Sequence, residues 1–410
     1  MTTTVLVSGA GIAGPALAYW LTRHGHAVTV VESAAAPRPG GQTVDLRGAG
    51  REVVERMGLM PAVREACMAQ EGIAYVDASG AHVAEMPVDA FGGEGIVSEI
   101  EILRGDLARI LLDATADVEY LYGLRVTGLE NGADDVEVTF SDGQVRTFDL
   151  VVGADGPHSG IRGLAFGPEE RFVTPVGGYT AWFTAPDPVG LDGWYEMYNE
   201  PGRVASIRPD TTPGRAKAGL SFLSGPLGYD RRDQAAQREL VAERFAGMGW
   251  VTPTLVEAVR TADDFYLDMV GQVRMDHWTR GRVALVGDAG YCPTPLTGLG
   301  TTLALVGAYV LAGELSRTAD HATAFAAYEE RMRPLVKEGQ TLPPGGMTGY
   351  CPKTRGAIRM RVLTTRAMVS RIGQPIAKKL FFSKSQAIAL PNYSSGAGDA
   401  ADQEGDRVRA

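Results

Sequence analysis

Cysteine is scarce in this chain: its 410 residues include three, Cys67, Cys292 and Cys351, at wide and irregular spacing. The sequence has no CxxC pair and no even set of cysteines, so it predicts neither a zinc or other metal site nor a disulfide framework. Three free, buried thiols are the simplest interpretation, and a reducing cytoplasmic location suits them best.

Basic residues are also fewer than acidic ones. Lys and Arg number 39 against 49 Asp and Glu, a formal net charge of -10, which argues against a nucleic-acid partner. Two apolar stretches, residues 2–22 and 296–315, have the length of targeting or membrane segments. The first lacks a basic start and the second contains Glu314 and several glycines, so we expect both to be buried core and expect no membrane partner.

The pattern of the first 150 residues is typical of a nucleotide-binding α/β domain. Two β-branched runs, residues 5–8 and 28–31, flank a helical pattern at 13–24 and predict a βαβ start. A strand and a helix follow between residues 99 and 113. Residues 118–150 alternate polar and apolar around Asn131-Gly132 and Asp142-Gly143, which predicts a β-meander.

From residue 172 to 275 the pattern changes to aromatics, prolines and short alternating runs, which predict an antiparallel sheet with one helix at about 234–248. A strand at 283–286, a long helix at about 299–316 and a helix at 322–332, ended by Pro334, return to the first pattern. We therefore expect a Rossmann-like α/β domain (residues 1–171 and 276–335) with an inserted, mostly antiparallel β-sheet substrate domain (172–275).

Beyond Pro334 the chain becomes basic, and we expect a C-terminal helical segment over residues 336–390 and a disordered tail over 391–410. Ile358, Val362, Met368 and Ile372 recur at helical spacing and predict an amphipathic helix. Packing on the body of the protein with a solvated basic face is the expected arrangement. A lid or a partner-binding surface is the alternative.

A GxGxxG motif lies directly between the first strand and the first helix, with Gly9, Gly11, Ala13 and Gly14 in the turn. The first glycine permits the tight turn, the second lets a pyrophosphate approach the backbone, and the third lets helix and strand pack closely. Glu32 ends the second strand, where a carboxylate can accept hydrogen bonds from ribose hydroxyls. Together these features predict dinucleotide binding.

A second motif favours FAD over NAD. The strand at 283–286 ends in Gly287-Asp288, and Gly298-Leu299-Gly300 opens the long helix that follows. Asp288 can bind the hydroxyls of a ribityl chain, although capping a turn is an alternative role. The helix start favours negative charge, which a reduced flavin carries at N1 and the C2 carbonyl.

Three signatures, GAGIAG at residues 9–14, GADG at 153–156 and Gly287-Asp288, resemble the group A flavin monooxygenases typified by p-hydroxybenzoate hydroxylase, which include tetracycline-modifying and polyketide-tailoring members. The resemblance covers residues 4–335 and implies that the Rossmann-like domain is an FAD-binding domain. It implies roles in cofactor binding for these residues: Glu32 at the adenosine ribose, Arg104 at the FAD linker, Asp155 and Gly156 at FAD and the pyridine nucleotide, Asp288 at the ribityl or pyrophosphate region, and Gly298, Leu299 and Gly300 beside the isoalloxazine ring.

The chain departs from that family pattern in one motif. Gly290-Tyr291 stands where many relatives have Ala-His, so no histidine role is carried over. A second GxGxxG is also missing, as expected if NADPH or NADH binds transiently in a cleft rather than in its own domain.

By resemblance, NADPH or NADH reduces FAD, oxygen forms a C4a-hydroperoxyflavin, and one oxygen atom passes to a small aromatic or polycyclic, polyketide-type substrate such as those of antibiotic biosynthesis. Tyr179, Trp182, Tyr198 and Phe222 are the candidate substrate-pocket residues, and no side chain is singled out as catalytic. A flavin oxidase or reductase, a Baeyer–Villiger-type or antibiotic-inactivating oxygenase, and a non-catalytic flavin sensor are the alternatives. Both a monomer and a homodimer are compatible with the sequence.

Overall fold

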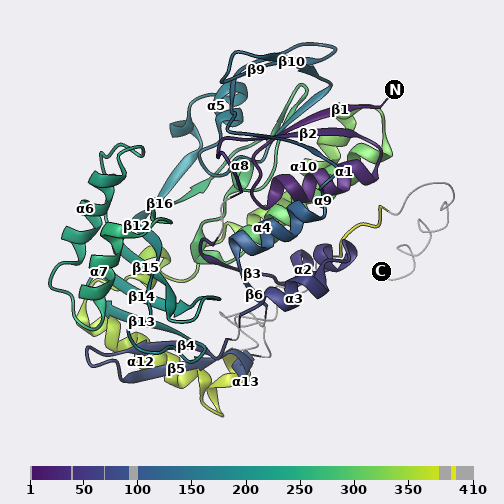
Figure 1. Cartoon of the computed structure of the whole chain (residues 1–410). Coiled ribbons are helices and arrows are strands. Elements are labelled where there is room, and N and C mark those ends of the chain that lie inside the picture. Colours follow the sequence, from purple (N-terminus) through teal and green to yellow (C-terminus); the bar gives the residue numbers. More distant parts are fainter. Residues whose placement is uncertain (1, 38–39, 69, 92–99, 378–388, 394–410) are drawn as a thin grey trace.

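The computed structural model describes residues 2–37, 40–68, 70–91, 100–377 and 389–393, and it divides into an upper and a lower part in Figure 1. The upper part contains a parallel sheet. The lower part contains a larger, mostly antiparallel sheet. This is the mixed α/β architecture that the sequence predicts.

Six strands form the sheet of the upper part. In sheet order they are β17 (Thr279–Arg280), β18 (Val283–Leu285), β11 (Leu150–Gly153), β1 (Thr4–Ser8), β2 (Ala27–Glu32) and β7 (Glu119–Tyr122). All neighbours run parallel except β17 and β18. β11 is buried along its whole length, as apolar strands are when both faces of a sheet are covered. The predicted βαβ start is confirmed.

Helices pack on this parallel sheet. They are α1 (Ala13–Arg23), α4 (Arg104–Asp113), α5 (Gly160–Phe166), α9 (Gly300–Arg317) and α10 (His321–Gly339), with α2 (Gly48–Arg56) and α3 (Met60–Ala66) beside them. α9 lies against α1, α2 and α10 and is buried from Thr301 to Leu315. None of the helices in the described ranges combines the length and the hydropathy that a bilayer span requires. Most of the apolar stretch at 296–315, from residue 301 onward, is therefore core, whereas residues 296–300 are partly exposed and line the cavity.

A small antiparallel sheet covers the end of the parallel one, as Figure 1 shows at the top. It consists of β8 (Val126–Asn131), β9 (Val136–Phe140) and β10 (Val145–Phe148). The meander predicted for 118–150 is therefore present, but its first strand, β7, pairs with β2 in the parallel sheet instead.

Seven strands form the sheet of the lower part. Their order is β16 (Tyr266–Val273), β12 (Val173–Pro186), β15 (Arg215–Leu223), β14 (Arg203–Pro209), β13 (Trp194–Glu200), β4 (Gly72–Val76) and β5 (His82–Pro87). β4 and β5 come from residues that the sequence-based division assigned to the first domain. They join this sheet because β4 pairs in parallel with β13, a contact across more than a hundred residues that no local pattern reveals.

Two helices, α6 (Gln234–Phe245) and α7 (Thr252–Thr261), cover the outer face of the seven-stranded sheet (Figure 1). The sequence predicted a single helix extending to residue 248. α6 ends earlier, and α7 was missed, although Pro253 in its first turn and the buried Leu255 and Val259 on one face are helix signals.

The prediction that Pro334 ends a helix is wrong. α10 continues through it to Gly339. An internal proline removes one helical hydrogen bond and costs about 3 kcal/mol. Leu335 and Val336, both buried immediately beyond it, offset that cost because ending the helix would expose them.

The C-terminal segment contains α11 (Gly346–Tyr350), α12 (Arg355–Val369) and α13 (Gly373–Ala377). α12 packs on the lower sheet through Met368 and Val369, which contact Met86 and Ala90. The apolar face predicted for this helix included Ile372. That residue lies beyond the end of α12 and is 82% exposed, so it is not part of the face.

The basic side chains of α12 are not simply solvated. Arg361 donates to Asn199 Oδ1 at 2.9 Å, and Arg366 donates to the Val83 carbonyl at 2.7 Å. Arginines therefore help to fasten this helix to the sheet.

The tail predicted to be disordered from residue 391 begins with ordered residues. Tyr393 is buried, and its hydroxyl donates to Glu314 Oε1 at 2.5 Å. Arg56 donates to the carbonyl of Pro391 at 2.7 Å. Residues 394–410 lie outside the described residues.

Candidate cofactor and substrate cavity

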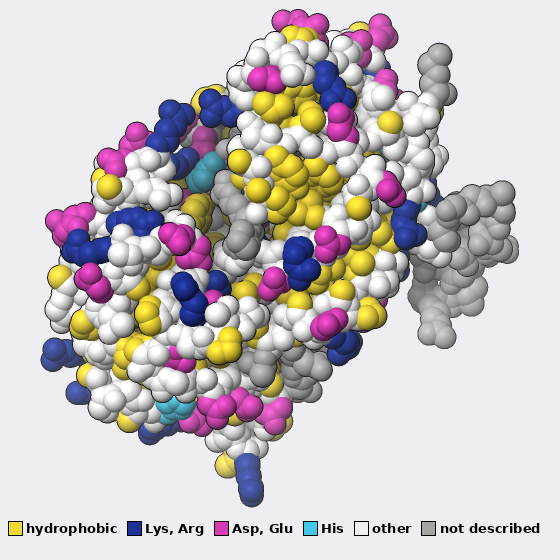
Figure 2. Space-filling view, viewed as in Figure 1, with side chains coloured by type: hydrophobic (Ala, Val, Ile, Leu, Met, Phe, Trp, Pro, Cys, Tyr) yellow, Lys and Arg dark blue, Asp and Glu magenta, His cyan; other side chains and the backbone are white. Residues whose placement is uncertain are grey.

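One cavity of about 2820 Å³ lies where the two parts meet and is lined by residues from both. Drug-sized ligands occupy pockets of about 300–1,000 Å³, so this cavity has room for a dinucleotide and a second molecule. In Figure 2, hydrophobic side chains gather in the middle of the visible face, with charged side chains around them.

The GxGxxG turn forms one wall. Gly9 has a φ of +108°, and a Cβ there would lie 2.5 Å from the carbonyl oxygen of Ala154. A Cβ at Gly14 would lie 1.9 Å from the Gly9 carbonyl oxygen. Only glycine fits either position, while Gly9, Gly11 and Ala13 line the cavity.

Glu32 ends β2 beside this turn. Its carboxylate accepts from the Ala10 amide at 2.9 Å and from the Ala34 amide at 2.8 Å. With a third bond, from Ser33 Oγ at 3.1 Å, they hold the carboxylate at the edge of the cavity with part of its acceptor capacity unused.

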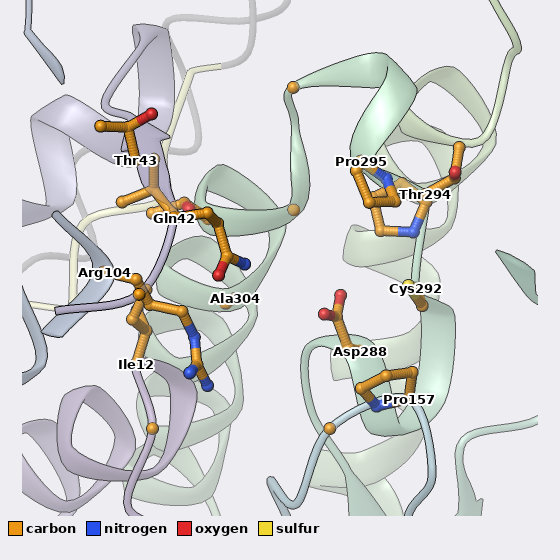
Figure 3. Close-up of a pocket in the computed structure, with 18 of the residues that line it drawn as sticks. Ile12, Gln42, Thr43, Arg104, Pro157, Asp288, Cys292, Thr294, Pro295 and Ala304 are labelled. Atoms are coloured by element: carbon orange, nitrogen blue, oxygen red, sulfur yellow. The ribbon is translucent and has the colours of Figure 1, made fainter. Parts of the chain in front are cut away.

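Asp288 and Arg104 lie on opposite sides of the cavity in the close-up, with their polar ends directed into the space between (Figure 3). Burial raises the pKa of Asp288, and the Cys292 thiol and the Arg104 charge partly oppose that shift. A half-buried carboxyl of this kind is suited to hydrogen bonding with hydroxyl groups of a ligand.

The turn before α9 meets the GxGxxG loop. Gly287, at a φ of +65°, would bring a Cβ within 3.2 Å of the Ala13 Cβ, so the two cofactor motifs are packed against each other. Gly298, Leu299 and Gly300 line the same cavity as Gly9 and Gly11. No side chain among the described residues caps the N-terminus of α9, and the first residues of this helix line the cavity, so their free amides can serve a ligand there.

The GADG loop lines the cavity between these two motifs. Asp155 and Gly156 line the cavity, but both carboxylate oxygens of Asp155 are already engaged, with Ser159 Oγ at 2.5 Å and the Ile161 amide at 3.2 Å. Asp155 therefore shapes the loop and binds the first turn of α5, whose N-cap is Ser159.

Arg162, which is fully buried, joins this loop to the Gly-Asp turn. Its guanidinium donates to the Ala289 carbonyl at 2.9 Å and to the Pro157 carbonyl at 2.6 Å. Tyr291, which follows the Gly-Asp turn, is core: it is fully buried and its hydroxyl lies 2.9 Å from that of Tyr328.

The four predicted substrate residues divide between the two faces of the lower sheet. Trp182 lines the cavity and stacks on Tyr266. Tyr179 and Phe222 stack on each other in the core beneath α6, and Tyr198 contacts Trp250 on the same side. None of these three lines the cavity, because successive strand residues point to opposite faces.

Other side chains on the cavity face escaped sequence reasoning. They are Thr180, Met197, Ser206, Arg208 and Asp268 from the sheet, Asp45 and Glu101 from a short ribbon, and His158 from the GADG loop. Strand alternation from Trp182 would have found Thr180. No local signal marks Glu101.

His158 connects the two parts of the molecule. Its ring nitrogens lie 3.0 Å from Glu169 Oε2 and 3.0 Å from Asp268 Oδ2. Burial lowers the pKa of His158, but the two hydrogen-bonded carboxylates outweigh burial and raise it to about 9. The imidazolium is a charged link between the loop and β16.

These features fit a flavin dinucleotide. The glycine turn leaves room for a pyrophosphate, the uncapped start of α9 favours a negatively charged ring edge, and the half-buried Asp288 carboxyl lines the cavity, where it can bind hydroxyl groups of a ligand.

Comparison with known proteins supports this assignment of a flavin dinucleotide to the cavity. The FAD binding domain family matches residues 2–339. A flavin-dependent monooxygenase of Legionella longbeachae is 40% identical over 337 residues, covering 82% of this chain and 86% of that protein. An FAD-dependent monooxygenase of Sarocladium schorii, asL4, is 38% identical and covers 86% of this chain and 89% of that protein.

Comparison with solved structures supports the same assignment. The tetracycline destructase Tet(51) aligns over 96% of this chain and 99% of its own, with a TM-score of 0.79 and 34% identity. The chain belongs to the FAD binding domain family, and FAD is its cofactor. Within that family it is a member of the FAD-dependent monooxygenases, which are oxidoreductases.

Proposed function

We propose that this enzyme uses FAD, NADPH or NADH, and oxygen to hydroxylate a small aromatic or polycyclic, polyketide-type molecule. The observation that carries the proposal is the single cavity that joins both dinucleotide motifs to the inner face of the lower sheet. When bound, FAD supplies the electron transfer and the oxygen activation that amino-acid side chains lack.

The residues that would hold FAD follow the order of the motifs. Glu32 would bind the adenosine ribose, and the glycine turn with Arg104 would bind the pyrophosphate; all of them line the cavity. Asp288 would bind the ribityl hydroxyls. The start of α9 at Gly298–Gly300 would support the negatively charged edge of the reduced ring.

The substrate would lie between the Gly298–Gly300 loop and the lower sheet. Trp182, Met197 and Tyr195 offer flat and apolar surface there, and Thr180 and Ser206 offer hydroxyls. Such a wall orients an oxygenated ring and excludes water from it. We also infer a cytoplasmic location from the three free thiols.

Antibiotic inactivation is the second candidate. It is favoured by the alignment with a tetracycline destructase over nearly the whole of both chains. The two candidates share one chemistry and differ in the substrate.

The test is turnover with defined compounds. Purified, yellow protein is mixed with NADPH or NADH, oxygen and a panel of phenols, anthraquinones and tetracyclines. We expect faster oxidation of the nicotinamide with a fitting substrate and a product heavier by one oxygen atom. Hydrogen peroxide as the sole oxygen product across the panel would refute oxygen insertion and favour an oxidase.

A variant pair tests the cofactor assignment. Asp288→Ala should lose bound FAD, measured by flavin absorbance after desalting. Asp276→Ala, an exposed aspartate outside the cavity, should keep it. Stoichiometric FAD in Asp288→Ala would exclude the role proposed for this carboxyl.

A further inference from the structure

One side of α12 carries an apolar stripe that faces solvent. Its members are Gly356, Met360, Leu363 and Ala367, which follow one another at spacings of four, three and four residues and therefore share one side of the helix. All four are exposed, Met360 to 60% and Leu363 to 58%. We call these four residues the outer stripe.

The opposite side of α12 is the one that packs on the lower sheet. Ile358, Val362, Thr365 and Val369 repeat the same spacing, and each of them is buried or half-buried. A surface helix needs one apolar side to attach it to the core. The outer stripe is a second apolar side that does not serve this attachment, and exposed apolar residues with a polar rim mark an interaction surface.

Arginines follow one flank of the outer stripe. Arg355, Arg359 and Arg366 each lie one residue before a member of the stripe, and all three are exposed. Arg355 and Arg359 form no ion pair within the described residues. In the turn between α12 and α13, Arg371 and Ile372 repeat the combination of an exposed cation and an exposed apolar side chain.

The charge of the whole C-terminal segment has one sign. Residues 339–398 contain nine Lys and Arg and no Asp or Glu, although the chain as a whole has a net charge of -10. Glu85 on β5, the strand against which α12 packs, is already paired with His82 at 2.8 Å. A partner for this face must therefore be anionic.

A flat anionic surface suits this face better than a second copy of the chain. A second α12 would bring its own arginines to the contact and no acidic residue from its segment, so like charges would meet. α12 lies at the lower end of the molecule in Figure 1, where a planar surface can approach it. Basic side chains beside leucine and methionine are typical of helices that lie in the interface of an anionic bilayer.

We propose that the outer stripe and the arginines beside it dock the protein on a bilayer that contains anionic phospholipid. Met360 and Leu363 insert among the headgroups, and the guanidinium groups bind lipid phosphates. Docking of this kind uses neither of the two long apolar stretches of the sequence and requires no spanning helix. Thr364 and Ala367 also line the large cavity, so docking sets that side of the cavity beside the lipid.

The first test is sedimentation of the FAD-loaded, full-length protein with lipid vesicles. One set is phosphatidylcholine alone, and the other contains about one third phosphatidylglycerol. We expect binding to the anionic vesicles only, and weaker binding as salt is raised, because salt screens the attraction between exposed charges. Equal binding to both sets, or binding to neither, would overturn the inference.

A pair of arginine substitutions tests the basic flank. Arg355→Gln combined with Arg359→Gln should weaken the partition onto anionic vesicles about twentyfold, since each cation near such a surface contributes roughly fivefold. The matched control, Arg215→Gln combined with Arg232→Gln, removes the same charge from exposed positions outside α12 and should bind as wild type does. An equal loss of binding in both double variants would show that net charge, and not this face, is responsible.

A second pair tests the outer stripe. Met360→Ser combined with Leu363→Ser should weaken binding about tenfold or more. Val145→Ser combined with Val189→Ser, at exposed apolar positions elsewhere, should leave it unchanged. Since every substituted side chain is exposed, FAD content and melting temperature should match those of wild type.

Two other occupants of the face give distinct results. Self-association that the Met360 and Leu363 substitutions abolish would assign the face to a second copy. Tighter binding to poly-L-glutamate than to anionic vesicles would assign it to an acidic protein. Either result would overturn lipid docking, and none of these measurements depends on the oxygenation proposed above.

Discussion

Arg162 is the buried cation that ties two cofactor loops together, and replacing it tests how the cavity is held open. In Arg162→Met the methionine fills most of the volume but donates no hydrogen bond. The carbonyls of Ala289 and Pro157 then lose the donors that now lie 2.9 and 2.6 Å away.

The magnitude follows from those bonds. A hydrogen bond that involves a charged group contributes about 1.5–3 kcal/mol, so two contribute roughly 3–6 kcal/mol. Removing a buried cation also removes its desolvation cost, which offsets part of the loss. Glu169, 3.6 Å from Arg162, keeps His158 and Arg231 as partners. We expect a net loss of about 3 kcal/mol in the free energy of unfolding.

The consequence for the cofactor follows from the position of the loops. Both flank Asp288, so loosening them should weaken FAD binding by about tenfold or more, equivalent to about 1.4 kcal/mol. Urea unfolding of the FAD-free protein and titration of FAD by flavin fluorescence measure the two effects. Arg162→Lys should not restore stability or FAD binding, because a single ammonium group cannot reproduce the planar arrangement of donors in the guanidinium group.

The control is Arg171→Met, an exposed arginine on the same segment, for which we expect a change within about 0.5 kcal/mol. If Arg162→Met unfolds and binds FAD as wild type does, the two carbonyl contacts do not organise the cavity and the reasoning fails.

Three further variants probe other parts of the structure. Gly9→Ala should abolish FAD binding, whereas Gly25→Ala, at a φ of +84° with open space around it, should lose only about 1 kcal/mol in unfolding; equal FAD binding by both would contradict the steric argument. His158→Gln should lose about 3 kcal/mol below pH 6.5, because the folded-state pKa is raised to about 9, and the difference from wild type in urea unfolding should vanish as pH rises through 9; a difference that grows with pH would reverse the sign. Tyr393→Phe removes the hydroxyl that donates to buried Glu314 and should lower stability by about 1–2 kcal/mol in thermal unfolding with FAD content unchanged; an unaltered melting temperature would show that this contact is dispensable.

The cofactor motifs were predictable because residues close together in the chain specify them. A φ of +108° at Gly9 and the close packing of Gly14 demand glycine within a few residues of a β-branched strand. Glu32, Asp288 and Gly298 each follow a strand or open a helix at a fixed offset, so their positions along the chain place them at one edge of a parallel sheet.

The substrate wall was not predictable in the same way. Alternation along a strand separates Trp182 from Tyr179, but only the packing of α6 and α7 decides which face is core and which lines the cavity. Pro334 inside α10 shows the same limit, since burial of the following residues outweighs a local preference to end the helix.

The sequence by itself determined the nucleotide-binding βαβ unit and its FAD motifs, since short-range spacing and backbone conformation specify them. Only the tertiary structure decided that β4 completes the lower sheet and that Asp45 lies opposite Glu101 under Arg208. The physical reason is that cross-strand register and shared burial depend on residues far apart in the chain, where no local periodicity records the contact.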